Sequence, residues 1–274
     1  ETTRVFAGAN DGMLHSFDQN GNETFAYIPF PVMPALTSIA DYMEGIKFKS
    51  FVDGPVKLFH LDDNKDGIIT VGEKAFIIFG YRRGAKYYTV IDVSILDAPK
   101  FVQHIPVEGQ SWAKPLIFNK GNAKYMVLAG GYDPCFDPDI PSGCSTNGSG
   151  HLEPDGNEVT IWKYNSMTGK FDSFRLIEPD SNGATQRDTE WLRASIVADP
   201  IAINTSDTLD RETEFVYLID ISGTVFRIDV GSSDSNLWTF RAVYKQRLNA
   251  LDTSSWIGSA NQVRTYNGFA IYPP

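Results

Sequence analysis

One pattern recurs four times along the chain and constrains the fold more than any other feature of the sequence. Each copy has an apolar strand, a turn rich in Gly, and a second strand that ends in an aromatic residue or Asp, which is a hairpin signature. The copies occupy residues 5–18, 76–93, 126–164 and 215–229. Recurrent hairpins at irregular spacing are typical of a β-propeller with insertions. We therefore predict an all-β fold, a modified β-propeller.

The spacing of the hairpins predicts where the insertions lie. At about 45 residues per blade the chain holds roughly five or six blades at most, so the ring is either modified or completed by residues outside this piece. Residues 29–47 combine prolines with apolar residues at helical spacing and predict one short helix. Residues 131–157 predict a long surface loop. We expect blades over residues 1–230 and a linker or an unfinished last blade of the same domain over 231–274.

Residues 62–73 fit the calcium-loop pattern D-x-[DN]-x-[DN]-G-x5-E without a substitution. Gly67 allows the sharp turn at loop position 6, and a hard cation prefers a shell of oxygen ligands with several negative charges. The expected ligands are side-chain oxygens, one backbone carbonyl at position 7 and a bidentate Glu at position 12: Asp62, Asn64, Asp66, Ile68, Thr70 and Glu73. The sequence therefore predicts a Ca²⁺ site.

The segments on either side of this loop predict strands, where a helix-loop-helix sensor would have helices. Residues 51–61 and 74–80 are short apolar runs rich in β-branched and aromatic residues. We expect a calcium clip between two strands, with Ile69 holding the loop to the body of the protein. The alternative is an acidic surface hairpin without an ion. Gly67 and Glu73 both stand at the offsets that calcium requires, which favours the clip.

The two cysteines, Cys135 and Cys144, lie in a loop rich in Pro and Gly. A zinc site would need more ligands nearby, and only His151 is close. A redox motif would have tighter spacing. A local disulfide that staples the long loop is the interpretation that fits best, and it implies an oxidising, secretory environment.

Charge and hydropathy exclude several classes of partner. The net charge of −10 and the pI of about 4.9 argue against nucleic acid, because phosphate binding needs a basic face. No apolar run approaches the length of a membrane span. Because the first residue is Glu1 and not Met, we expect the chain to be a piece of a longer one.

An ordered set of segments resembles the PilY/PilC family of type IV pilus tip and biogenesis factors. The most specific block is residues 5–18, and the others follow in family order: residues 26–29, 51–55, 87–93, 112–115, 215–220 and 227–229. The resemblance implies a modified, quinoprotein-like β-propeller, the C-terminal domain of that family. It also implies an extracellular protein at the cell surface or pilus tip, associated with the outer membrane, which supports pilus assembly and adhesion. Pilin or minor pilin subunits and a host-surface receptor are the implied partners.

The sequence departs from the family at its calcium loop. The family carries a short loop of the form D-x-N-x-D-G-x-x-D just before the strand that matches residues 215–218. Residues 204–210 occupy that place here, without Gly and with too few carboxylates in register. We therefore expect that calcium binding is kept, but at residues 62–73, where this sequence carries its strong loop.

Two other functions compete with a pilus role. A quinoprotein-like dehydrogenase shares the propeller and uses calcium, but it clamps its cofactor with a vicinal disulfide, and Cys135 and Cys144 are separated by eight residues. A carbohydrate-binding propeller would display exposed aromatic residues in its loops. The four histidines are scattered, and no G-x-S-x-G elbow, P-loop or H-E-x-x-H occurs. We expect a protein that is not an enzyme.

Overall fold

The structure of the chain is a computed structural model. This structure describes residues 3–38, 50–136, 155–179, 181, 183, 185–205 and 212–245, together with the backbone of 264–266 and 269–271. Strands and short 3₁₀ helices form its regular structure. The prediction of an all-β protein is confirmed. None of the helices in these ranges has the length and apolar character needed to cross a membrane.

Four antiparallel sheets follow one another in chain order, each a meander of neighbouring strands. The first contains β1 (Arg4–Gly8), β2 (Leu14–Asp18) and β3 (Glu23–Tyr27). The second contains β4 (Val56–Leu61), β5 (Lys74–Phe79), β6 (Tyr87–Asp92) and β7 (Lys100–Pro106). The third contains β8 (Leu116–Lys120), β9 (Ala123–Ala129), β10 (Val159–Asn165) and β11 (Lys170–Ile177).

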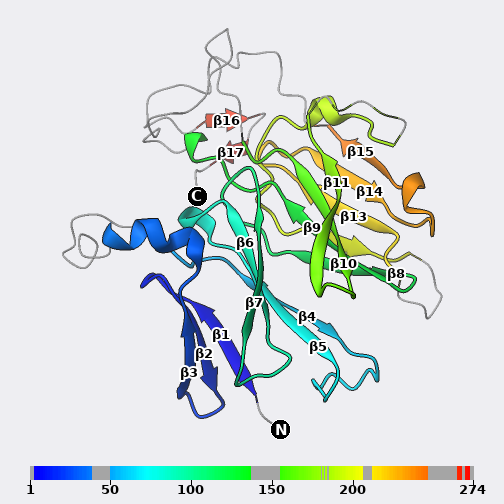
Figure 1. Cartoon of the computed structure of the whole chain (residues 1–274). Coiled ribbons are helices and arrows are strands. Elements are labelled where there is room, and N and C mark those ends of the chain that lie inside the picture. The colour runs from blue at the N-terminus through cyan, green and yellow to red at the C-terminus, as the bar shows by residue number, and fades with distance from the viewer. Residues whose placement is uncertain are drawn as a thin grey trace.

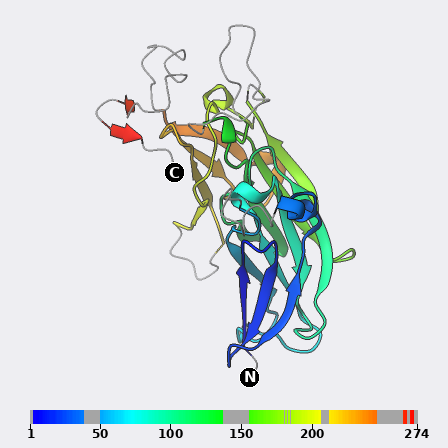
Figure 2. The same cartoon turned by 90° about the vertical axis from the view of Figure 1, so that its left-hand side faces the viewer.

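The fourth sheet contains β12 (Ile201–Ile203), β13 (Phe215–Ile219), β14 (Val225–Asp229) and β15 (Thr239–Tyr244). A separate pair joins β16 (Arg264–Tyr266) to β17 (Phe269–Ile271). The first sheet (blue) and the fourth (yellow to orange) lie at opposite sides of the molecule in Figure 1, and Figure 2 turns the first sheet toward the viewer. The recurrent hairpins predicted from the sequence are thus adjacent strand pairs of successive sheets: β1–β2 in the first sheet and the central pairs of the other three.

Short 3₁₀ helices lie in the connections between strands. They are η1 (Phe30–Ser38), η2 (Arg82–Gly84), η3 (Pro134–Phe136), η4 (Thr189–Trp191) and η5 (Ser235–Leu237). Helices η1 and η4 lie between successive sheets, and the others lie between strands of one sheet. The helix predicted within residues 29–47 corresponds to η1, with Pro34 inside it. Residues 39–49 lie outside the described part. The predicted boundary at residue 230 falls between β14 and β15, which pair with each other in one sheet.

The central strands of the second and third sheets are apolar on both faces because each sheet packs between two others. On β5, Ala75, Ile77 and Phe79 face a cluster shared with the first sheet, whereas Phe76 and Ile78 face the third sheet. On β9, Met126 and Leu128 complete that second cluster, while alternate residues pack against the fourth sheet. Successive side chains of a strand point to opposite faces, so a continuous apolar run is what two-sided burial requires.

Asp and Asn residues at the strand ends close the turns of these meanders. Asp18 Oδ1 accepts from the backbone N–H groups of Asn20 and Asn22 at 2.8 and 2.9 Å. Asp220 Oδ1 accepts in the same way from Ser222 and Thr224, at 2.9 Å each. Such side chains mimic a backbone turn. The Asp that ends several of the predicted strands therefore has a structural role in its own turn.

The sheets approach so closely at several points that only glycine fits between their backbones. A Cβ atom on Gly80 would lie 2.5 Å from the carbonyl oxygen of Ser111, and one on Gly54 would lie 2.2 Å from the carbonyl carbon of Gly80. Backbone atoms cannot turn aside as a side chain can. These contacts therefore fix how the segment before β4 and the end of β5 lie against the segment that leads to β8.

Replacing Gly80 with Ala is expected to lower the free energy of unfolding by about 1–3 kcal/mol, the usual cost of overpacking a well-packed interior. Gly231→Ala is the matched control, because its nearest non-neighbour atom would lie 4.0 Å away and its φ is not positive. There the extra Cβ reduces the freedom of the unfolded chain, so we expect no loss of stability. Urea unfolding of the two variants measures both values, and equal effects would contradict the close-packing account.

Candidate metal centre

The loop of residues 62–73 connects β4 directly to β5. The last residue of β4, Leu61, pairs with the first residue of β5, Lys74, so the two ends of the loop start side by side. The loop therefore forms the tip of the β4–β5 hairpin (Figure 1). The prediction that strands and not helices flank the loop is confirmed.

The three side chains predicted at positions 1, 3 and 5 are held by the backbone of their own loop. Asp62 accepts from the N–H groups of Asp66 at 3.1 Å and Gly67 at 2.9 Å. Asn64 Oδ1 also accepts from the N–H of Asp66, at 3.0 Å, so Asp62 and Asn64 converge on one donor. Asp66 accepts from the N–H of Ile68 at 2.7 Å. A carboxylate oxygen keeps a further lone pair after such a bond, which leaves it able to bind a cation.

The path of the loop depends on residues with positive φ, of which Gly72 (φ 99°) is one near its end. Lys65 has φ 61° and Gly67 has φ 76°. Gly67 would meet no atom within 4 Å if it carried a Cβ, so its backbone angle and not crowding explains the glycine. Ile69 packs against the cluster between the first and second sheets, which confirms that this residue holds the loop to the body of the protein.

Glu73 closes the loop and accepts hydrogen bonds on both carboxylate oxygens. Oε2 accepts from the N–H of Thr70 at 2.8 Å, and Oε1 accepts from the N–H of Asp63 at 3.1 Å. The bond from the Thr70 backbone is the largest cause that lowers the pKa of Glu73 to about 2, with smaller contributions from the Thr70 hydroxyl, His60 and Asp63 against an opposing effect of burial. Glu73 therefore stays ionised across the neutral range.

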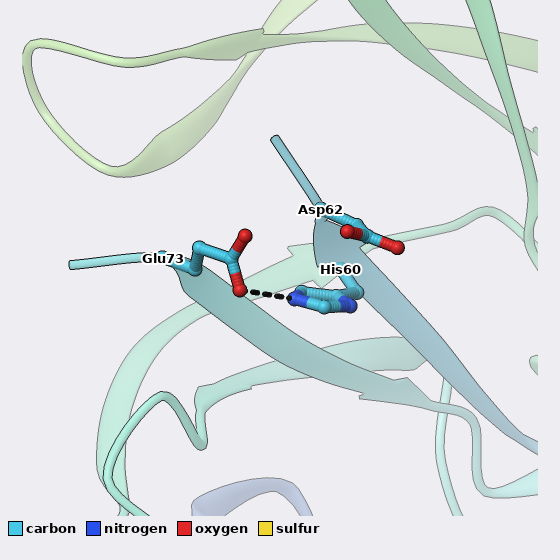
Figure 3. Close-up of side chains that lie close together, drawn as sticks. All are labelled: His60, Asp62 and Glu73. Atoms are coloured by element: carbon cyan, nitrogen blue, oxygen red, sulfur yellow. Dashed lines mark hydrogen bonds and ion pairs between the residues drawn. The ribbon is translucent and has the colours of Figure 1, made fainter. Parts of the chain in front are cut away.

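His60 belongs to the same site, although the sequence did not single it out. Its Nε2 lies 3.2 Å from Glu73 Oε2, and the two side chains are only 10% and 7% exposed. One ligand atom each from His60, Asp62 and Glu73 lie within 4.8 Å of one another (Figure 3). The available signal was positional: His60 stands two residues before Asp62, a spacing that places side chains on one face of an extended chain.

The other predicted site residues are placed less completely. Thr70 exchanges backbone contacts with Glu73, because the N–H of Glu73 donates to the Thr70 carbonyl at 3.1 Å. The N–H of Ile68 donates to Asp66. This bond does not involve the carbonyl of Ile68, which was the group predicted as a ligand. Cys135 lies in η3 and donates its N–H to Asp133 at 2.8 Å. Cys144 lies outside the described residues, so the disulfide stays a prediction.

Taken together, the geometry defines an all-β protein of stacked meander sheets with an acidic, oxygen-rich loop at the tip of one hairpin.

No family model matches the chain. Among curated proteins it is similar to the type IV pilus biogenesis factor PilY1 of Pseudomonas aeruginosa, with 35% identity over 134 residues, which cover 46% of this chain and 11% of that protein. A PilY1 homolog of Xylella fastidiosa is 24% identical over 247 residues, 85% of this chain and 14% of that protein.

A solved structure supports the same relationship at the level of the fold. The C-terminal domain of Pseudomonas aeruginosa PilY1 has a TM-score of 0.53 and 22% identity, covering 86% of this chain and 44% of that chain. The chain is therefore similar in sequence to proteins of the PilY1 family, and its fold is similar to that of the PilY1 C-terminal domain. It spans about a tenth of the length of the curated relatives that it matches.

Proposed function

We propose that this chain is a calcium-clipped, propeller-type domain of a type IV pilus biogenesis factor at the cell surface or pilus tip. It supports pilus assembly and adhesion through contacts with pilin or minor pilin subunits and a host-surface receptor, and it catalyses no reaction. The names of the relatives support the pilus role. The meander sheets stacked in chain order support the propeller, because successive blades have this arrangement.

The main support for the calcium proposal is that the fold holds the oxygen ligands of the loop in fixed positions. Three side chains at positions 1, 3 and 5 are fixed by N–H groups of the loop, and the Glu at position 12 is ionised and held on both oxygens. Four carboxylates against one lysine within twelve residues leave a strong local excess of negative charge. A cation relieves that repulsion and joins the ends of β4 and β5, which is a structural role suited to millimolar extracellular calcium.

Calcium is expected to bind with one ion per chain and to raise the melting temperature. An ion that binds only the folded state adds about 2.7 kcal/mol at a hundredfold excess over Kd, which corresponds to roughly 5–10 °C for a chain of this size. Isothermal titration calorimetry on chelator-treated protein gives the stoichiometry. Melting curves in calcium and in chelator give the stabilisation.

Two substitutions in the same loop separate an ion site from a merely acidic hairpin. Asp66→Asn at position 5 should remove the calcium-dependent rise, whereas Asp63→Asn at position 2 makes the same change of charge at an exposed residue outside the ligand set and should keep it. Equal losses in both variants would reduce the effect to non-specific charge screening. The absence of any calcium response in the unmodified chain would overturn the clip.

The pilus role is tested in the full-length protein in its own organism. Removal of the gene should reduce surface pili, and the full-length protein should restore them. The same experiment is then done with the full-length Asp66→Asn form. The number of surface pili that it restores at high and at limiting calcium shows whether the clip matters for assembly. Unchanged piliation after removal of the gene would overturn the pilus role while leaving the calcium site untouched.

A further inference from the structure

His60 gives the end of the loop a ligand that a calcium site does not need. Calcium takes oxygen ligands, whereas imidazole suits zinc and other transition metals. The residue is positioned by the fold: it lies on β4 next to Leu61, which pairs with Lys74 directly after Glu73. Figure 3 shows its ring between the carboxylates of Asp62 and Glu73.

The separation of the ligand atoms fits a small metal ion. In a tetrahedral zinc site with ligand distances of about 2.0–2.2 Å, two ligand atoms lie roughly 3.3–3.6 Å apart. His60 Nε2 and Glu73 Oε2 are 3.2 Å apart, and one ligand atom from each of His60, Asp62 and Glu73 lie within 4.8 Å of one another. The N–H of Asp63 donates to the other oxygen of Glu73 at 3.1 Å. Such outer contacts orient a metal ligand.

We propose that His60, Asp62 and Glu73 form a mixed nitrogen–oxygen site for a divalent transition metal, with zinc as the probe, in competition with calcium. The two carboxylates balance the charge of the ion. Three protein ligands leave a fourth position for water. Because the side chains of His60 and Glu73 are about nine-tenths buried, the site is already largely desolvated before the ion enters.

The two ions would share part of their ligands, which makes their binding mutually exclusive. Asp62 and Glu73 belong to both sets. Asn64 and Asp66 belong only to the calcium set, which rests on the proposed function, and His60 belongs only to the zinc set. Substitutions of the ligands that belong to only one set therefore distinguish the two sites. If calcium does not bind, the zinc site still stands on His60, Asp62 and Glu73.

The test is zinc calorimetry on the metal-free chain near pH 7.5, with three variants. His60→Gln should weaken zinc binding by at least about tenfold, because losing a ligand costs more than losing an outer contact, and it should leave calcium binding intact. Asp66→Asn should weaken calcium binding and leave zinc binding intact. His15→Gln is the matched control: His15 contacts two carboxylates, but on opposite ring nitrogens, Glu23 on Nδ1 and Asp11 on Nε2, so one ion cannot join all three.

Competition provides a second measurement. Calcium at saturating concentration should raise the apparent Kd for zinc in the unmodified chain and leave it unchanged in Asp66→Asn. If zinc fails to bind, or binds His60→Gln as tightly as the unmodified chain, the proposal is wrong and the His60 contact serves only to position Glu73. Should His60→Gln lose its calcium response as well, His60→Asn repeats the test with a shorter amide.

Discussion

Replacing Trp238 with Ala is expected to lower the free energy of unfolding by about 3–5 kcal/mol, the usual cost of removing a large buried aromatic side chain. Trp238 is completely buried between η5 and β15. Its ring contacts three aromatic rings of the third sheet, with centroid distances of 4.8 Å to Tyr125 and 5.8 Å to Phe118 and Phe174. The substitution would therefore leave a cavity where the third and fourth sheets meet.

The neighbouring residue provides the control for this prediction. Leu237 is 63% exposed, so Leu237→Ala should change stability by no more than about 0.5 kcal/mol. Urea denaturation compares the two variants. It is monitored by far-ultraviolet circular dichroism, a signal that does not rely on tryptophan fluorescence. A small effect of Trp238→Ala would mean that the third and fourth sheets do not depend on this aromatic contact.

The second large effect concerns Asp220 and pH. Burial is the largest cause that raises the pKa of this carboxyl to about 6, against hydrogen bonds from Ser222, Thr224 and Gly223 that lower it. Its Oδ2 is buried and has no hydrogen-bond partner within the part of the chain that the structure describes. The folded state therefore keeps the proton up to about pH 6, whereas the unfolded chain releases it near its ordinary value of about 3.9.

The sign of the pH dependence follows from this difference. Between about pH 4 and pH 6 the folded state binds more protons, so stability rises as the pH falls. The shift of about two pKa units corresponds to roughly 3 kcal/mol, fully present below pH 4 and lost above pH 6. Asp220→Asn removes this titration. Unfolding curves at pH 7.5, 6, 5 and 4 should show the unmodified chain gaining about 3 kcal/mol relative to the variant.

The comparison with Asp220→Asn matters more than either curve alone, because other carboxylates titrate in the same range. Burial also raises the pKa values of Glu108, Asp133 and Glu158, and their contribution is common to both proteins. A constant difference between the two proteins from pH 4 to 7.5 would show that the Asp220 carboxyl is not desolvated in solution.

The sequence predicted the strands well because local chemistry specifies them. Apolar runs such as residues 76–79 and 126–129 cannot remain exposed, and the Gly, Asn and Asp residues between strands form turns through their own backbone preferences and side-chain bonds. The loop of residues 62–73 was predictable for the same reason. Its potential ligands, its turn at Gly67 and its contact through Ile69 all lie within twelve consecutive residues.

What the tertiary structure decided depends on residues that are distant in the sequence. Periodicity shows that β5 and β9 are apolar, but only the stacking of sheets assigns their two faces to different clusters. His60 and Glu73 are thirteen residues apart and meet because the β4–β5 register places them together. Likewise, Asp220 looks like any turn residue in the sequence, and its raised pKa arises only from burial. Local patterns specified elements and loop chemistry, whereas burial and cross-strand proximity required the assembled fold.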